Sequence, residues 1–151
     1  MRPALLSLGS AAPALALCSG ASVQREYREA DLVVKARLVG QTDTWTDTPD
    51  AAYLRRWGNG SLITRYELAP SRMFKGRPGK RVRFFEEHDS GAFYVDPDKD
   101  YLLFLNYYQP ARGMPTEARG AVYVRYACGQ SKPWNEVRAS DLREVNRLSQ
   151  R

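Results

Sequence analysis

The sequence has few of the residues that most catalytic and metal-binding sites use. It contains one histidine, His88, and two cysteines, Cys18 and Cys128, among 151 residues. A Ser-His-Asp or Cys-His catalytic arrangement would therefore have to be built around His88. A glycine-rich phosphate loop and a dinucleotide fingerprint are also absent from the sequence. We therefore predict a protein that is not an enzyme and that carries no cofactor.

Long apolar runs are also scarce, with one exception at the start of the chain. Residues 4–17 are largely apolar, and residues 14–16 have the small-x-small pattern of a signal peptidase site. We expect residues 1–16 to be a secretory signal; a lipoprotein signal ending at Cys18 and a buried N-terminal helix are the alternatives. No later run approaches the roughly 20 apolar residues that cross a bilayer, so no transmembrane span is predicted. The predicted location is secreted or in the cell envelope.

The two cysteines lie far apart in the chain. In an exported protein, Cys18 and Cys128 are expected to form a disulfide, whereas buried free thiols are the alternative if the chain is not exported. The bond would close a loop of about 110 residues, for which the chain-entropy account gives a stabilisation of about 4–5 kcal/mol.

The charge is moderately basic, with 23 lysines and arginines against 17 acidic residues and a formal net charge of +6. The basic residues are scattered among acidic ones along the sequence. This pattern predicts a mixed, solvated surface more than a basic stripe.

Alternation of apolar and polar residues predicts five strands. The expected ranges are 32–38, 61–74, 81–84, 101–108 and 121–128. Pro70 is expected to mark a bulge or break in the second strand, because proline cannot donate to a ladder. Residues 101–108 are apolar enough to form a central strand that is buried on both faces.

Helices are predicted at both ends of the domain. Leu142, Val145 and Leu148 would share one face of a C-terminal helix that Ser140 caps, and residues 23–30 would form a shorter helical turn. Together with five strands, these elements predict a mainly β fold: a five-stranded OB-type barrel with a short N-terminal helix and a C-terminal helix. One domain, residues 17–151, accounts for the mature chain.

One connection, residues 41–60, is long and rich in aromatic side chains, among them Trp45, Tyr53 and Trp57. Loops of this length commonly carry function. We expect either an aromatic flap packed on the barrel or a binding loop.

Two acidic runs have residue types that could bind a metal. His88 has acidic neighbours, but a hydrophilic loop after the third strand explains the same run. Residues 96–100 have the D-x-D-x-D opening of a calcium loop, yet Tyr101 and Tyr107 occupy the glycine and glutamate positions of that motif. We predict a tight acidic turn at 96–100 and no metal at either run.

Several short motifs resemble those of the tissue inhibitors of metalloproteinases and the wider netrin-like module superfamily. They follow one another over roughly residues 16–148: 31–40 (DLVVKARLVG), 65–68 (RYEL), 73–76 (MFKG), 90–93 (SGAF), Cys128, and 133–135 (PWN). The resemblance implies an OB barrel in an exported protein-binding module that has a zinc endopeptidase as its partner.

In that family, a Cys-x-Cys start places the first cysteine at the mature N-terminus, where its amino group and carbonyl chelate the protease zinc. The resemblance aligns Cys18 with the second cysteine and Cys128 with its partner. Ala16 and Ser90 stand in place of the other bonded pair, and Leu17 corresponds to the side chain that enters the primed pocket. The missing bond weakens the inhibitor prediction, as does a cleavage site that favours a start at Leu17.

Two functional hypotheses follow, with a structural envelope protein without inhibitory activity as a third reading. The first is a metalloendopeptidase inhibitor whose partner-binding residues would be Ala16, Leu17, Cys18, Ser19, Trp45, Tyr53, Trp57 and Ser90. The second is an OB-fold protein that binds an anionic polymer, such as an acidic polysaccharide, through basic residues and stacking. Export argues against nucleic acid as the partner.

Overall fold

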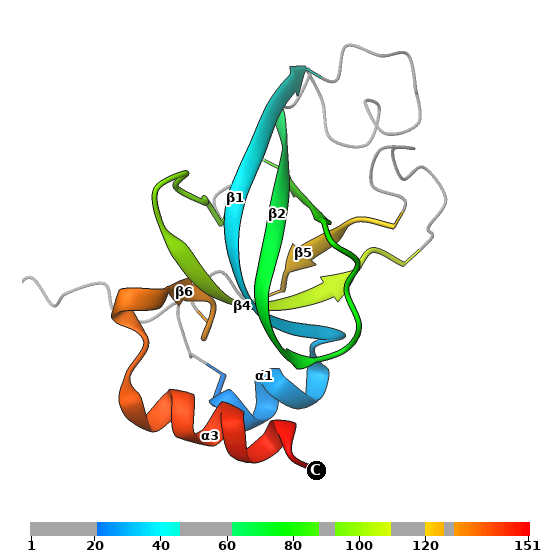
Figure 1. The fold of residues 1–151 in the computed structure, drawn as a ribbon. Helices are drawn as coiled ribbons and strands as arrows, with labels where there is room; N and C mark the ends of the chain where they lie inside the picture. Colours follow the sequence, from blue (N-terminus) through cyan, green and yellow to red (C-terminus); the bar gives the residue numbers. More distant parts are fainter. Residues whose placement is uncertain (1–20, 46–61, 88–92, 110–119, 126–128) are drawn as a thin grey trace, which may run out of the picture.

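The computed structural model describes residues 21–45, 62–87, 93–109, 120–125 and 129–151 (Figure 1). Within these ranges, the elements in chain order are α1 (Val23–Glu29), β1 (Leu32–Trp45), β2 (Leu62–Lys75), β3 (Val82–Glu87), β4 (Asp100–Tyr107), β5 (Val122–Val124), β6 (Lys132–Pro133), the 3-10 turn η2 (Trp134–Glu136) and α3 (Ala139–Ser149). No helix in these ranges has the length and apolarity needed to cross a membrane.

The strands close into a barrel. Neighbouring strands follow the order β1, β2, β3, β5 and β4, and β4 pairs back with β1. All of these pairs are antiparallel except β3 with β5, which are parallel and meet at a single register pair, Phe84 with Val122. The two-residue β6 adds to β4. The prediction of a mainly β fold with a closed five-stranded, OB-type barrel and a helix near each end is confirmed.

Alternate residues of the strands fill the barrel, because successive side chains of a strand point to opposite faces. The buried side chains of this core are Leu32, Val34, Ala36, Leu38, Tyr66, Leu68, Val82, Phe84, Val95, Tyr101, Leu103, Leu105 and Val122. Residues 101–105 of β4 are all buried, which confirms the prediction of a central strand. Tyr101, Leu103 and Leu105 point into the barrel. Leu102 and Phe104 point out of the barrel and are buried under the helices.

Both helices pack against one end of the barrel wall (Figure 1). Val23 and Tyr27 of α1 and Val145 of α3 form a second core with Val33, Phe74, Leu102 and Phe104 of the strands. Leu142 and Leu148 pack on the same core, so the predicted apolar face of the C-terminal helix is confirmed.

Polar contacts fasten α1 to the end of β2. The hydroxyl of Tyr27 donates to the carbonyl of Phe74 at 2.6 Å, and the Lys75 ammonium donates to three carbonyls at the C-terminal end of α1. Those carbonyls belong to Tyr27, Arg28 and Ala30, at 2.8, 3.0 and 2.6 Å. A cation is favourable there, because the last carbonyls of a helix have no partner within it.

Irregularities in β1 and β2 change which side chains face outward. The register with β2 shifts between Val33 and Val34, between Lys35 and Ala36, and between Leu38 and Gly40. The second shift lies opposite Pro70, which confirms the bulge predicted there.

Four sequence-based details were wrong. The first strand continues to Trp45, so residues 41–45 are strand and not loop, because they pair with β2 as far as Leu62. The third strand likewise continues through the acidic residues to Glu87. The fifth strand comprises Val122–Val124, so Ala121 and Arg125 are not part of it, and residues 126–128 of the predicted strand lie outside the described ranges.

The fourth concerns Ser140, which does not cap the C-terminal helix. The N-cap is Arg138, whose carbonyl accepts from the Leu142 amide at 3.1 Å, so Ser140 lies inside the first turn. The Arg138 guanidinium instead binds the carboxylate of Asp141 at 3.0 and 3.1 Å. This ion pair holds the pKa of Asp141 below its usual value.

Candidate functional site

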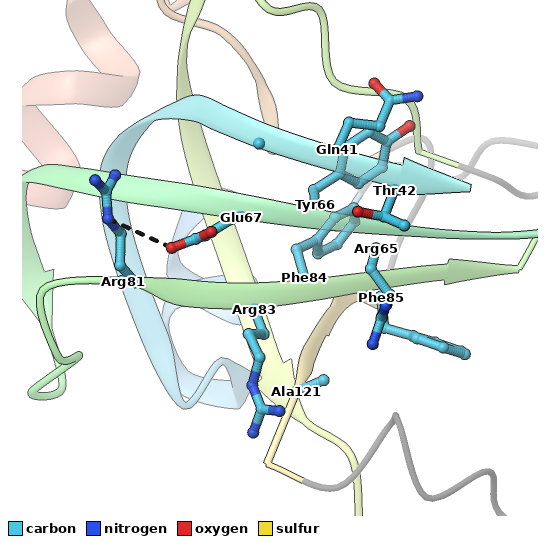
Figure 2. A pocket seen from close by; sticks show the side chains of 11 residues that line it. Gln41, Thr42, Arg65, Tyr66, Glu67, Arg81, Arg83, Phe84, Phe85 and Ala121 are labelled. Atoms are coloured by element: carbon cyan, nitrogen blue, oxygen red, sulfur yellow. Dashed lines mark ion pairs between the residues drawn. The ribbon is translucent and has the colours of Figure 1, made fainter. Parts of the chain in front are cut away.

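A groove of about 550 Å³ lies on the outer wall of β1, β2 and β3 (Figure 2). It is found further along β1 from the segment that the helices cover. The lining residues are Gly40, Gln41, Thr42, Arg65, Tyr66, Glu67, Arg81, Arg83, Phe84, Phe85 and Ala121.

The strand register aligns the outward side chains in two rows across the groove. Gly40, Glu67 and Arg83 lie opposite one another in the first row. Thr42, Arg65 and Phe85 do so in the second row. Residues that lie opposite one another in paired strands point to the same face.

Gly40 leaves space at the β1 side of the groove. A Cβ built there would lie 3.5 Å from the Cβ and from Oε2 of Glu67, which is ordinary van der Waals contact. The backbone therefore does not require glycine at this position. The missing side chain instead keeps this part of the groove open.

The groove carries three arginines, Arg65, Arg81 and Arg83, and one acidic residue, Glu67. The Arg81 guanidinium lies 3.4 Å from the Glu67 carboxylate, and both side chains are about half exposed, at 53% and 51%. Such exposed pairs contribute only about 0–1 kcal/mol, so another anion can compete for Arg81. Arg65 forms no ion pair with any described acidic residue.

A positive-φ glycine accommodates the Arg83 side chain. Gly120 has a φ of 68°, and a Cβ at that position would lie 3.3 Å from Nη2 of Arg83. Figure 2 shows the Arg83 side chain beside Ala121, at the opposite side of the groove from Gln41 and Thr42.

Aromatic rings support the wall of the groove but are not exposed in it. Tyr66 and Phe84 stack inside the barrel with ring centroids 5.5 Å apart. Phe85 meets Tyr108 edge-to-face at 5.5 Å, and Tyr108 lies 4.7 Å from Tyr123. The three rings among the lining residues, Tyr66, Phe84 and Phe85, are only 4%, 1% and 1% exposed. Burial also raises the pKa of the Tyr66 phenol, which stays protonated at neutral pH.

The predicted inhibitor residues fall mostly outside the described ranges. Those outside are Ala16, Leu17, Cys18, Ser19, Tyr53, Trp57, Ser90 and Cys128. Trp45 is the last residue of β1 and pairs with Leu62 of β2. The inhibitory edge and the disulfide therefore stay predictions.

The described residues nearest to the two cysteines in sequence do lie together. The side-chain amide of Gln130, two residues after Cys128, donates to the carbonyl of Ala21 at 2.9 Å. Ala21 is three residues after Cys18. The chain segments that follow the two cysteines are thus held side by side.

Glu26 strengthens this contact from within α1. Both oxygens of its carboxylate accept from the Gln130 backbone N–H, at 2.9 and 3.0 Å, although the residue is only 3% exposed. A Cβ at Gly129 would overlap this carboxylate, so any other residue there would have to displace it from the Gln130 N–H. Burial raises the pKa of Glu26, while the Gln130 N–H and the charge of Lys132 oppose that rise.

Asp96 and Asp100 in the acidic run at 96–100 form ion pairs with lysine and arginine side chains. Residues 96–100 form the predicted turn, in which the Lys99 ammonium binds Asp96 at 2.7 Å. Asp100 pairs with Lys35 at 3.2 Å and with Arg37 at 2.8 Å. No group of three or more His, Cys, Asp or Glu residues within the described ranges could hold a metal ion. His88 lies outside those ranges.

The arginine groove was not identified from the sequence. Arg81 and Arg83 alternate with apolar residues, a pattern that places both on one outer face. Arg65 joins them only through the pairing of β2 with β3, which the linear sequence does not display.

Comparison with known proteins does not indicate what the groove binds. No protein-family model matches the chain, and no curated protein matches its sequence. The function is therefore argued from the geometry and charge of the site.

Proposed function

We propose that the protein is an exported, non-catalytic binding module that holds an anionic polymer in the groove on the outer wall of β1, β2 and β3. The observation that supports this proposal is the convergence of Arg65, Arg81 and Arg83 on one open hollow. Guanidinium groups present several donors in a planar fork that matches carboxylate, sulfate and phosphate oxygens.

The position of the groove agrees with the general use of OB-type barrels. Such barrels bind oligonucleotides and oligosaccharides on the face of the second and third strands. Here the three arginines and Glu67 all lie on β2, on β3 or directly before β3.

The chemistry of the lining favours binding over catalysis. An arginine stays protonated in proteins and does not exchange protons with a substrate. The one carboxylate, Glu67, is half exposed and is paired with Arg81. These groups can hold and orient an anion, but they do not form a nucleophile and base pair.

We favour a polymer over a small anion as the ligand because each contact between an exposed arginine and an anionic group is weak. An exposed charge pair contributes about 0.2–1 kcal/mol, so one small ion would bind weakly. A chain that carries several anionic groups engages the arginines together, and each further contact becomes intramolecular.

Binding to a panel of anionic polymers tests the proposal. Heparin, polyphosphate and oligo(dT) would be titrated against the protein, with the double variant Arg65→Gln/Arg83→Gln and the control Arg143→Gln on α3. Loss of two charged contacts of about 0.5–1 kcal/mol each should weaken binding of at least one polymer roughly 5- to 30-fold. Affinity of the unmodified protein should also fall steeply as salt rises. Equal affinity of the double variant and the control for every polymer would contradict the proposal.

A second candidate function, metalloendopeptidase inhibition, is supported by the barrel and by the contact between Gln130 and Ala21, which follow Cys128 and Cys18 closely in the sequence. It requires a mature chain whose free amino group belongs to Ala16. N-terminal sequencing of the mature protein, with an inhibition assay against a zinc endopeptidase, tests it. A chain that begins at Ala16 should inhibit, and one with an additional residue before Ala16 should not. Identical behaviour of the two chains would exclude zinc chelation.

A further inference from the structure

We infer that the polymer held in the groove is an acidic polysaccharide that bears carboxylate or sulfate groups, and not a nucleic acid. This inference rests on the proposed function, because it concerns the ligand of the same groove. It depends on three features of the lining: the burial of its aromatic rings, the position of Glu67, and the polar groups on β1.

The buried rings separate the two classes of polymer. Proteins that bind single-stranded nucleic acid stack bases on exposed aromatic side chains, and each stacked base strengthens binding by roughly tenfold or more. In this groove Tyr66, Phe84 and Phe85 are almost fully buried, and their faces contact other rings of the protein. A base in the groove would meet strand backbone and arginine side chains, and none of the described residues that line the groove offers it an exposed ring.

The number of cationic groups argues against duplex DNA as well. A protein that binds a duplex commonly contacts about 6–10 phosphates, because the duplex has one negative charge per roughly 1.7 Å of its axis. The described lining of the groove offers three guanidinium groups, and that of Arg81 is paired with Glu67.

Glu67 sets a further condition on the ligand. It pairs with Arg81, lies directly opposite Arg83 and is two residues from Arg65 on the same face of β2. A negative charge among the three arginines repels an anionic group placed directly against it, so the ligand has to place its anionic groups on the arginines and away from Glu67. A polysaccharide also carries uncharged hydroxyl groups between its anionic groups, and one of these can donate to the Glu67 carboxylate. The backbone of a DNA strand such as oligo(dT) has no hydroxyl donor to place there.

The β1 side of the groove suits sugar hydroxyls. The backbone at Gly40 is partly exposed, and Thr42, two residues further along β1, shares its outer face. Gln41 lies opposite the inward-facing Tyr66 and donates to Asp43 at 3.3 Å. The Thr42 hydroxyl can donate and accept a hydrogen bond, as sugar hydroxyl groups do.

Competition experiments test the inference. Labelled heparin bound to the full mature chain would be displaced by unlabelled heparin, by dextran sulfate, by polygalacturonate and by oligo(dT). We expect at least one of the polysaccharides to displace it at a concentration roughly tenfold or more below that of oligo(dT). Dextran sulfate carries only sulfate and polygalacturonate only carboxylate, so the stronger of these competitors identifies the anionic group.

Two variants probe the proposed features directly. Gly40→Leu would fill the β1 side of the groove without removing charge, and we expect it to weaken heparin binding at least fivefold while thermal unfolding stays cooperative. Glu67→Gln would remove the central negative charge, and we expect oligo(dT) to gain affinity more than heparin does. The matched control is Glu136→Gln, which removes an exposed carboxylate from η2.

The outcomes distinguish failure of the polysaccharide inference from failure of the proposed function. If oligo(dT) competes as well as or better than every polysaccharide, the inference is wrong while an anion-binding groove stands. If no polymer binds, or if Arg65→Gln/Arg83→Gln binds heparin as tightly as Arg143→Gln does, the proposed function itself is wrong.

Discussion

The outer wall of the barrel has two regions that use equivalent strand positions in opposite ways. Where α1 and α3 cover it, the outward residues are apolar: Val33, Phe74, Leu102 and Phe104. Where no helix covers it, along the groove, the outward residues are Arg65, Glu67, Arg81 and Arg83. The comparison shows that alternation specifies the inward set of side chains, whereas the outward set depends on what lies over each part of the wall.

The two regions also differ in how strongly they are tied to the rest of the fold. In the helix-covered region, Tyr27 and Lys75 make buried or half-buried hydrogen bonds between residues more than 40 positions apart in sequence. In the groove, the Arg81 to Glu67 ion pair is long and half exposed. We therefore expect substitutions to change stability in the helix-covered region and affinity in the groove.

The largest expected effect concerns the disulfide, whose described neighbours meet beside α1. Reduction of a Cys18 to Cys128 bond should lower the free energy of unfolding by about 4–5 kcal/mol, since it releases a loop of about 110 residues. Urea unfolding with and without reductant measures the change, and non-reducing mass spectrometry should find no free thiol. Two alkylatable cysteines in the exported protein would refute the bond.

Truncation of Phe104 should have the next largest effect. This side chain is 3% exposed and lies between the barrel and the helices, so Phe104→Ala should cost about 3–5 kcal/mol. Chemical denaturation measures the loss. Heparin affinity of the folded fraction should stay unchanged, and a parallel loss of affinity would show that the two regions are not independent.

Substitution of Glu26 should change the pH dependence of stability. Because burial raises its folded pKa above 4.5, the wild-type carboxyl favours the folded state while protonated, and this contribution is lost as pH rises through the folded pKa. Glu26→Gln stays neutral and retains an oxygen to accept from the Gln130 N–H.

Denaturation of Glu26→Gln and wild type at pH 4 and pH 7 measures this effect. The variant should gain stability relative to wild type as pH rises from 4 to 7. Only the difference between the two proteins is informative, because Asp100, Asp141 and Glu144 have lowered pKa values and stabilise both proteins above their unfolded pKa. A difference in stability that does not change with pH would show that Glu26 ionises as freely as in the unfolded chain.

The smallest expected effect on stability belongs to the groove. Arg65→Gln/Arg83→Gln should shift the free energy of unfolding by no more than about 0.5 kcal/mol per site, as exposed substitutions usually do. Thermal denaturation measures the change in stability, and a heparin titration of the same variant measures the change in affinity. If the double variant lost several kilocalories per mole of the free energy of unfolding, these arginines would be part of the structural framework.

The sequence was sufficient for the barrel and its helices but not for the groove. Apolar residues such as Leu32 and Val34 recur at every second position, so the inward face of β1 could be predicted. That alternation assigns Gly40 to the interior as well, but the register shift after Leu38 turns it to the outer wall opposite Glu67. A bulge is decided by pairing with the partner strand and leaves little trace in the sequence of one strand.

Ser140 illustrates a second limit. Serine is a favoured N-cap, yet the helix begins earlier because Arg138 can bind the carboxylate of Asp141 three residues on. The arginines show a third limit, since Arg65 is separated from Arg81 by 15 intervening residues and joins it only when β2 pairs with β3.

The close approach of Gly129 to Glu26 has a consequence for evolution. Any side chain at position 129 would occupy the space of the carboxylate, and loss of the carboxylate alone would leave the Gln130 N–H without its acceptor. Neither position can therefore change freely while the other stays as it is. Among homologous chains, we expect positions 26 and 129 to covary, with a larger residue at 129 accompanied by a shorter one at 26.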